Sequence, residues 1–355
     1  KPTVTDPRAA LEPGAPQVSP AYPNNLCLDY AFGDAAAVAK AFAEAAHVTT
    51  LDLVNNRLAV VAMEPRAAVA EYDAARDHFT LHVGSQGVFN LKNTLANDIL
   101  KIDPAKLRVL TYDVGGSFGM KIPSYPEYVA ILHAARELKR PVRWRDERSE
   151  SFLSDHQGRD SLYKARLALD EDGDVTALDV DVVGNLGAYM SFVGPMIVSL
   201  NVRKNAPGPY RLPLMHVRSR SVLTHTVPVG PYRGAGRPEG VYIMERLIEA
   251  AARETGRDAI ELRRQNLVRP HEMPFKAASD LVYDSGDFPQ LLDRALARAD
   301  DQGYTVRRKR SEAQGKLRGR AVACYLEVTA DKVTEMGGLR FEPDGRVTMI
   351  TGTCD

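Results

Sequence analysis

A short glycine-rich segment, Asp113–Lys121, constrains this chain more than any other stretch. Its three glycines are Gly115, Gly116 and Gly119. Lys106–Tyr112 before it suits a short strand, and Tyr125–Leu138 after it has the apolar spacing of a helix. Glycine allows tight turns or close approach to a ligand, and free N–H groups can bind an anion or an oxo group. The segment predicts a strand–loop–helix unit whose loop is either a plain turn or a ligand-binding loop.

A second glycine-rich loop, Pro231–Glu239, also separates a predicted strand from a predicted helix. A dinucleotide-binding fold would need a second strand after that helix, with an acidic residue about 20 positions on. Another helix follows instead, which disfavours nicotinamide binding. As a ligand-binding loop, the segment offers Arg233 and Arg237 to an anion, while its glycines let the backbone come close.

Two further segments carry side chains that suit a site. Gln86 lies in a turn after a predicted strand, where most glutamines are simply exposed to solvent. His156–Asp160 contains one histidine and one aspartate, so it is at best a weak metal site, and an interior salt bridge of Arg159 is an equal alternative. No Walker loop, Gly-x-Ser-x-Gly elbow or His-Glu-x-x-His helix occurs. These absences disfavour nucleophilic hydrolysis and helix-borne zinc catalysis.

Charge and cysteine content exclude other classes. The 355 residues carry 46 basic and 46 acidic side chains, which argues against a nucleic-acid partner bound through overall positive charge. The three cysteines are scattered, so we expect neither a disulfide framework nor a cysteine zinc site. No apolar run reaches membrane-spanning length and no secretory signal is visible, which favours a cytoplasmic protein without a membrane span. Because the first residue is Lys1, a preceding part is expected to be missing.

Alternating helix and strand patterns predict an α+β (mixed α/β) fold. Asp34 is the expected N-cap of a helix that ends near His47. Tyr163–Leu169 and Val175–Val183 form an expected β-hairpin, since apolar and polar residues alternate around Asp172-Gly173. The other expected strands are 48–54, 68–72, 79–83, 141–145, 217–229, 319–327 and 339–351, the last with a turn at Asp344-Gly345. The other expected helices are 89–100, 239–255, 258–266 and 288–300.

Three segments are expected to lack regular structure. Residues 1–25 are rich in proline, alanine and asparagine, which predicts an extended linker. Glycines and prolines punctuate 184–209, and basic residues fill 307–316, the expected connector. The sequence stops at the end of a predicted strand, so we expect more chain or another subunit to follow.

In their order, seven segments together resemble the large, molybdenum-binding subunit of the xanthine dehydrogenase, aldehyde oxidase and aerobic carbon monoxide dehydrogenase family. The segments are Gly84–Gln86, Gly115–Lys121, Glu147–Glu150 with His156–Asp160, Pro231–Glu239, Glu261–Leu267 and Thr351–Thr353. The resemblance covers residues 10–355 and implies the molybdopterin-binding domain of molybdenum hydroxylases. It implies three parts: the linker 1–25, a first subdomain over 26–310, and the incomplete start of a second over 311–355.

The resemblance implies a molybdopterin cofactor with molybdenum, usually as the cytosine dinucleotide in bacteria. The pterin dithiolene holds the metal, so no side chain is expected to ligate it directly. Gln86 would hydrogen-bond an oxo ligand of the molybdenum, while Phe118 and Gly119 would line the site and supply backbone N–H groups. The Arg233 loop would approach from another side. The implied catalytic residues are Gln86, Phe118 and Arg233, and the implied cofactor-binding residues are Gln86, Gly116, Phe118, Gly119, Arg233, Gly234 and Ala235.

The implied reaction is hydroxylation of an aldehyde or N-heterocycle with oxygen from water, with electrons leaving through iron–sulfur and FAD-containing flavin subunits. The family's catalytic glutamate and a second Gly-Gln-Gly cofactor loop would lie beyond Asp355, so the rest of the large subunit, or a second chain carrying it, is an expected partner. A non-catalytic remnant or assembly module of the same fold is one alternative. A carbon monoxide dehydrogenase-like enzyme is another, but members with that activity carry a copper-binding cysteine where this chain has Gly234.

Overall fold

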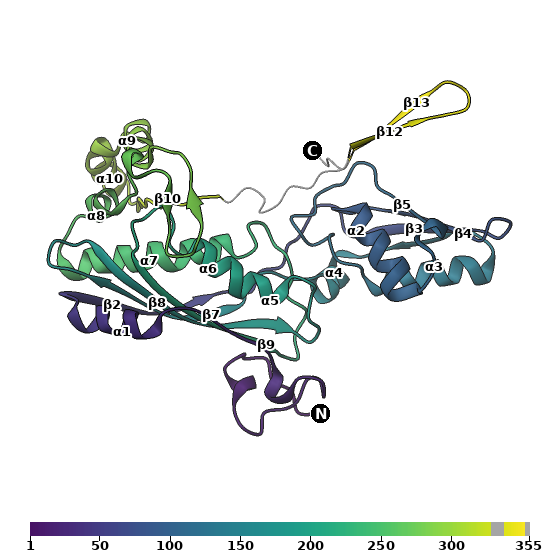
Figure 1. The fold of residues 1–355 in the computed structure, drawn as a ribbon, viewed down its shortest axis with the longest axis horizontal. Coiled ribbons are helices and arrows are strands. Elements are labelled where there is room, and N and C mark those ends of the chain that lie inside the picture. Colours follow the sequence, from purple (N-terminus) through teal and green to yellow (C-terminus); the bar gives the residue numbers. More distant parts are fainter. Residues whose placement is uncertain (328–336, 352–355) are drawn as a thin grey trace.

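Two β-sheets organise the chain into two lobes (Figure 1). The computed structural model describes residues 1–327 and 337–351. Of the terminal Thr351–Thr353 motif, the last two residues lie outside the described residues, as does Cys354. Among the described residues, no helix combines the length and apolar character needed to cross a membrane.

The larger sheet has five strands in the order β1-β9-β8-β7-β2. Their bounds are β1 Leu26–Gly33, β2 His47–Asn55, β7 Ser161–Leu169, β8 Val175–Gly187 and β9 Leu214–Leu223. Only β8 and β9 run parallel; the other neighbours are antiparallel. The β7–β8 hairpin predicted from alternation is confirmed, since Leu167 pairs with Leu178 across it.

Helices cover both faces of this sheet (Figure 1). The long helix α7 (Arg237–Thr255) places apolar residues such as Ile243 and Leu247 in the main core, against the Tyr163 side of the strands. The opposite face is covered by α1 (Ala35–Glu44), where Val38 packs on Ala168 and Ala177. Two well-packed faces make this lobe the rigid support of the loops that leave its strands.

The smaller sheet has the order β5-β4-β3-β6 and is covered by α3 (Pro126–Leu138). Its strands are β3 Ala67–Asp73, β4 His78–Val83, β5 Leu107–Leu110 and β6 Val142–Arg145. Strands β4 and β5 are parallel, so both end at the same edge of the sheet. That edge carries the first two candidate loops.

The remaining elements connect or extend the lobes. The helices are α2 Val88–Asn93, α4 Arg148–Ser154, α5 Gly194–Met196, α6 Val202–Asn205, α8 Ala259–Asn266, α9 Phe288–Arg298 and α10 Tyr304–Glu312. The strands are β10 Phe275–Lys276, β11 Val282–Tyr283, β12 Gly337–Phe341 and β13 Val347–Thr351. A π-helix, Thr94–Leu100, continues α2, so the single helix predicted over 89–100 is in fact two joined segments. The α+β fold is confirmed, as is the turn at Asp344-Gly345, which joins β12 to β13.

Three predictions about local structure are wrong. The segment 184–209 is not irregular: β8 runs to Gly187, and helical turns fill Gly194–Asn205 because Ile197, Val198 and Val202 are buried there. The expected connector 307–316 is largely α10. The expected strand 319–327 forms no strand, although its Val322 and Cys324 pack on the core.

At the N-terminus, residues 1–25 contain two short 3-10 turns, Ala9–Leu11 and Pro23–Asn25. Val4 and Ala10 are buried against Val183 and Val222 of the large sheet. The three-part domain division stays a prediction; its boundary after residue 310 falls inside α10.

Candidate functional site

The topology brings together the loops that were singled out one by one in the sequence. Gly84–Gly87 follows β4 and the Gly115–Lys121 loop follows β5, and these strands are parallel neighbours. The Gln86 N–H donates to the carbonyl oxygen of Lys121 at 3.3 Å. The two loops therefore form one surface at the edge of the small sheet.

The large sheet contributes the facing loops. Ser161 at the start of β7 pairs with Gly184 near the end of β8, so the His156–Asp160 segment and the segments after β8 and β9 share one edge. A short parallel bridge joins Gln157 to Val229. The site thus lies where loop-bearing edges of the two sheets meet.

Two hydrogen bonds hold the three main loops in register. The Gly119 N–H donates to Oε1 of Gln86 at 2.9 Å, and the Arg233 N–H donates to the carbonyl oxygen of Phe118 at 2.9 Å. Gly119 has φ +101°, and a Cβ there would lie 2.5 Å from the carbonyl oxygen of Pro231. Its missing side chain therefore serves loop-to-loop contact in this structure, and its N–H is already engaged by Gln86.

Backbone in the left-handed region clusters in these loops. Besides Gly119, positive φ angles occur at Gly116, Phe118, Gly234 and Ala235. Such conformations are costly for residues with a Cβ and concentrate where a site demands them. The Phe118 ring is 45% exposed, so an apolar face is presented to solvent at the centre of the site.

Several hydrogen-bond donors of these loops remain free. Within residues 1–327 and 337–351, no hydrogen bond is made by the N–H groups of Gly116, Ser117, Phe118 or Gly234. The same holds for Nε2 of Gln86, whose oxygen is engaged by Gly119. A set of donors without acceptors suits a ligand rich in oxygen or negative charge. The exposed guanidinium of Arg233 forms no hydrogen bond or ion pair to a described residue and adds positive charge.

A buried ion pair holds the Arg233 loop from behind. Arg159 is 8% exposed and lies 3.2 Å from Glu239, which is fully buried. Arg159 also donates to the carbonyl oxygens of Tyr232 at 3.0 Å and Arg233 at 2.6 Å. Glu239 accepts the Gly236 N–H at 2.8 Å. The interior salt bridge anticipated for Arg159 is confirmed.

A second ion pair holds the first loop. Lys121 is buried and lies 3.1 Å from Oε2 of Glu64, which also accepts the Gly115 N–H. Glu64 was missed in the sequence, because a lone glutamate in a bend carries no signal of its partner 51 positions away. Asn201, which donates to the carbonyl oxygen of Ala235 at 2.7 Å, was missed because its segment was expected to be irregular.

Comparison with known proteins gives this architecture a family. A model described as molybdopterin cofactor-binding domain matches residues 18–267. The chain belongs to the molybdopterin cofactor-binding domain family. The predicted relationship to the large, molybdenum-binding subunit of the xanthine dehydrogenase, aldehyde oxidase and aerobic carbon monoxide dehydrogenase family is thereby confirmed.

Named relatives of this molybdopterin-binding chain span a range of substrates. It is 33% identical to the gamma subunit of the 6-hydroxypseudooxynicotine dehydrogenase complex of Paenarthrobacter nicotinovorans, over 99% of this chain and 44% of that protein. It is 28% identical to the carbon monoxide dehydrogenase large chain of Hydrogenophaga pseudoflava, over 94% and 44% respectively. Quinoline 2-oxidoreductase from Pseudomonas putida 86 superposes with a TM-score of 0.90 at 28% identity, covering 100% of this chain and 46% of that one. The chain thus spans less than half the length of these relatives.

The loops fit a molybdopterin cofactor. The unpaired donors match a phosphorylated group and oxygen ligands, while the described residues contain no cluster of three or more His, Cys, Asp or Glu side chains that could hold a metal ion. Gln86, Gly116, Phe118, Arg233 and Gly234 each have a donor that forms no hydrogen bond to any described residue. Gly119 and Ala235 differ from them, because the N–H of each is bonded within the protein.

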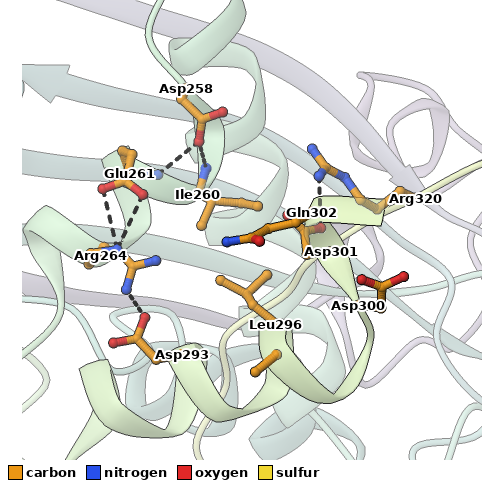
Figure 2. Close-up of a pocket in the computed structure, with 11 residues that line it drawn as sticks. Asp258, Ile260, Glu261, Arg264, Asp293, Leu296, Asp300, Asp301, Gln302 and Arg320 are labelled. Atoms are coloured by element: carbon orange, nitrogen blue, oxygen red, sulfur yellow. Dashed lines mark hydrogen bonds and ion pairs between the residues drawn. The ribbon is translucent and has the colours of Figure 1, made fainter. Parts of the chain in front are cut away.

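A pocket of about 770 Å³ lies between α8 and α9, apart from the candidate site (Figure 2). Its charged groups serve the protein itself. Asp258 caps α8 by accepting two backbone N–H groups, and Arg264 pairs with Glu261 and Asp293. Asp301 pairs with Arg320. These contacts tie the last helices together and point to no ligand.

Proposed function

We propose that this chain is the molybdopterin-binding part of an oxidoreductase that hydroxylates an aldehyde or an N-heterocycle, with water as the oxygen source. The observation that carries the proposal is the group of unpaired donors on three loops that hydrogen-bond to one another. A bound molybdopterin would supply two-electron oxidation of a carbon atom. Electrons would pass to iron–sulfur and flavin subunits, and the rest of the large subunit would complete the site.

The chain's own residues would bind and orient. The free Nε2 of Gln86 is a fixed donor because Gly119 holds the other end of the amide. Phe118 offers an exposed ring against which a flat substrate can lie. Arg233, whose backbone is fixed by Phe118, keeps its positive charge at the site.

Metal and nucleotide analysis of the purified native complex tests the proposal. We expect molybdenum and cytidine monophosphate to be released together, in equal amounts, which would identify the cytosine dinucleotide form. A complex with the expected partner subunits but neither component would instead support a non-catalytic remnant or assembly module.

Gln86→Ala is expected to slow turnover while leaving the fold intact. The side chain is exposed, so its loss costs little packing. It removes the Nε2 donor, worth about 1–3 kcal/mol or roughly fivefold to 160-fold slower turnover, and also the acceptor of the Gly119 N–H. Gln290→Ala on the exposed face of α9 is the matched control. The measurement is the steady-state turnover rate divided by the molybdenum content. An unchanged rate in Gln86→Ala would show that Gln86 does not act in the site.

The purified complex is expected to contain no stoichiometric copper and to show no carbon monoxide-dependent dye reduction. Glycine at position 234 has no sulfur, and copper(I) needs a soft thiolate or thioether ligand. Gly234 has φ +89°, and a Cβ there would lie 2.5 Å from Cδ of Pro238, so the loop is shaped for glycine. Copper analysis and a dye assay under carbon monoxide check this. Finding both stoichiometric copper and carbon monoxide-dependent dye reduction would instead support a carbon monoxide dehydrogenase-like enzyme.

A further inference from the structure

A pocket of about 710 Å³ lies beside the candidate site. Its walls are formed by segments that adjoin the three site loops in the sequence. One wall is α2 and the π-helix after it, which start two residues beyond Gln86. Another begins at Ile122, whose N–H donates to the carbonyl oxygen of Gly119 at 3.2 Å. Pro228, just before the Arg233 loop, forms part of a third. The pocket therefore lies directly beside the residues proposed to face the cofactor.

The walls that this chain supplies are poor in charge. Among the described residues, the walls contain no lysine or arginine, and their one carboxylate, Asp98, is on an exposed turn of the π-helix. Burial, helped by the charge of Arg66, lowers the pKa of His156 to about 4, so this lining residue is neutral near pH 7. Arg66 itself is fully buried and engaged by carboxylates, including Glu127 at 3.0 Å and Asp155 at 2.5 Å.

The same walls are rich in aromatic and apolar surface. Tyr189, Met190 and Phe192 line the pocket and are 77%, 46% and 66% exposed. Large exposed apolar side chains around a hollow mark a surface that binds something flat and apolar. Uncharged hydrogen-bonding groups, among them Asn90 and Asn93, supply the remaining polarity.

From this lining we infer that the substrate is an uncharged, flat heterocycle or aromatic aldehyde, and that carboxylated analogues are disfavoured; the inference rests on the proposed function. A carboxylate placed here would lose hydration without gaining a cation in return. Discrimination against it therefore comes from the missing basic residue and needs no steric block. The contrast matters in this family, whose named members include enzymes for quinoline and for nicotinate, which is a carboxylate.

Paired substrates test the inference in the purified, molybdenum-loaded complex. The probes are quinoline with quinoline-4-carboxylate, and benzaldehyde with 4-carboxybenzaldehyde. We expect kcat/KM to be about tenfold or more higher for the uncharged member of the pair that is turned over. Equilibrium titration of the same ligands into molybdenum-free complex should show the same order of Kd values.

Asn93→Arg places a cation on the pocket wall and should narrow or reverse the preference. The Asn93 side chain is exposed and bonded to no described residue, so the change disturbs no contact. Gln314→Arg, at an exposed position after α10, adds the same charge outside the pocket and should change nothing. A wild-type preference for the carboxylated members, or equal effects of both arginine variants, would overturn the inference and leave the proposed function standing. No turnover of any probe by the loaded complex would overturn both.

Discussion

Gly119→Val is expected to leave the purified subunit almost free of molybdenum. Gly119 has φ +101°, a region that β-branched residues avoid, and its Cβ would lie 2.5 Å from the carbonyl oxygen of Pro231. The backbone cannot easily yield, because hydrogen bonds to Gln86 and from Arg233 fix it on both sides of the peptide. Separating these loops would scatter the donors proposed to hold the cofactor. Molybdenum and cytidine monophosphate per purified subunit are the measurements.

Two companion variants separate the causes of that loss. Gly14→Val has a similar φ of +83° but open space around the added side chain, and it lies far from the site, so its molybdenum content should match wild type. Gly119→Ala already carries the offending Cβ and should lose most of the metal. Normal molybdenum in Gly119→Val would show that this loop does not hold the cofactor.

Capping residues in the sequence were sufficient to predict where several amphipathic helices begin and end. Asp34, the expected N-cap, and Asp258, the first residue of the expected helix 258–266, each accept two backbone N–H groups at the start of a helix. Gly256 ends α7 with φ +70°. These features depend on residues within a turn of one another, so one sequence contains all the needed information.

Tertiary contacts decided the segments that were predicted wrongly. Glycines and prolines suggested irregular structure for 184–209, but burial of Val198 and Val202, and a hydrogen bond from Ser219 to the Val198 carbonyl oxygen at 2.7 Å, stabilise helical turns there. Residues 319–327 contain the apolar run Ala321–Leu326 and were expected to form a strand, yet within the described chain no strand pairs with them. Such outcomes depend on neighbours that are distant in the sequence.

In the candidate site, too, some features follow from local sequence signals and others depend on tertiary contacts. Its glycines marked Gly115–Lys121 and Pro231–Glu239 as loops where backbone comes close to something. What each loop approaches could not be read from spacing, because the parallel pairing of β4 and β5 and the meeting of two sheet edges bring them together. The pocket beside the site was missed for the same reason, since its walls come from segments as far apart as Asn90 and Pro228.

Arg159→Met is expected to destabilise the subunit by about 3–5 kcal/mol and to lower its molybdenum content, because it leaves the carboxylate of Glu239 buried without a cation. Arg218→Met removes an exposed pair with Asp29, whose side chains are 51% and 39% exposed, and should cost at most about 1 kcal/mol. Thermal unfolding of the purified complex compares the two. Equal losses would mean that burial does not set the value of the Arg159 pair.

The double variant Arg159→Met with Glu239→Gln separates stability from loop geometry. Glutamine is neutral and can still accept the Gly236 N–H, so part of the lost stability should return. The donors to the carbonyl oxygens of Tyr232 and Arg233 stay missing, because methionine cannot replace the guanidinium. Molybdenum content and turnover should therefore remain low while the unfolding temperature recovers. If both recover together, the pair serves folding alone; if only stability recovers, Arg159 positions the loop that presents Arg233 and Gly234 to the cofactor.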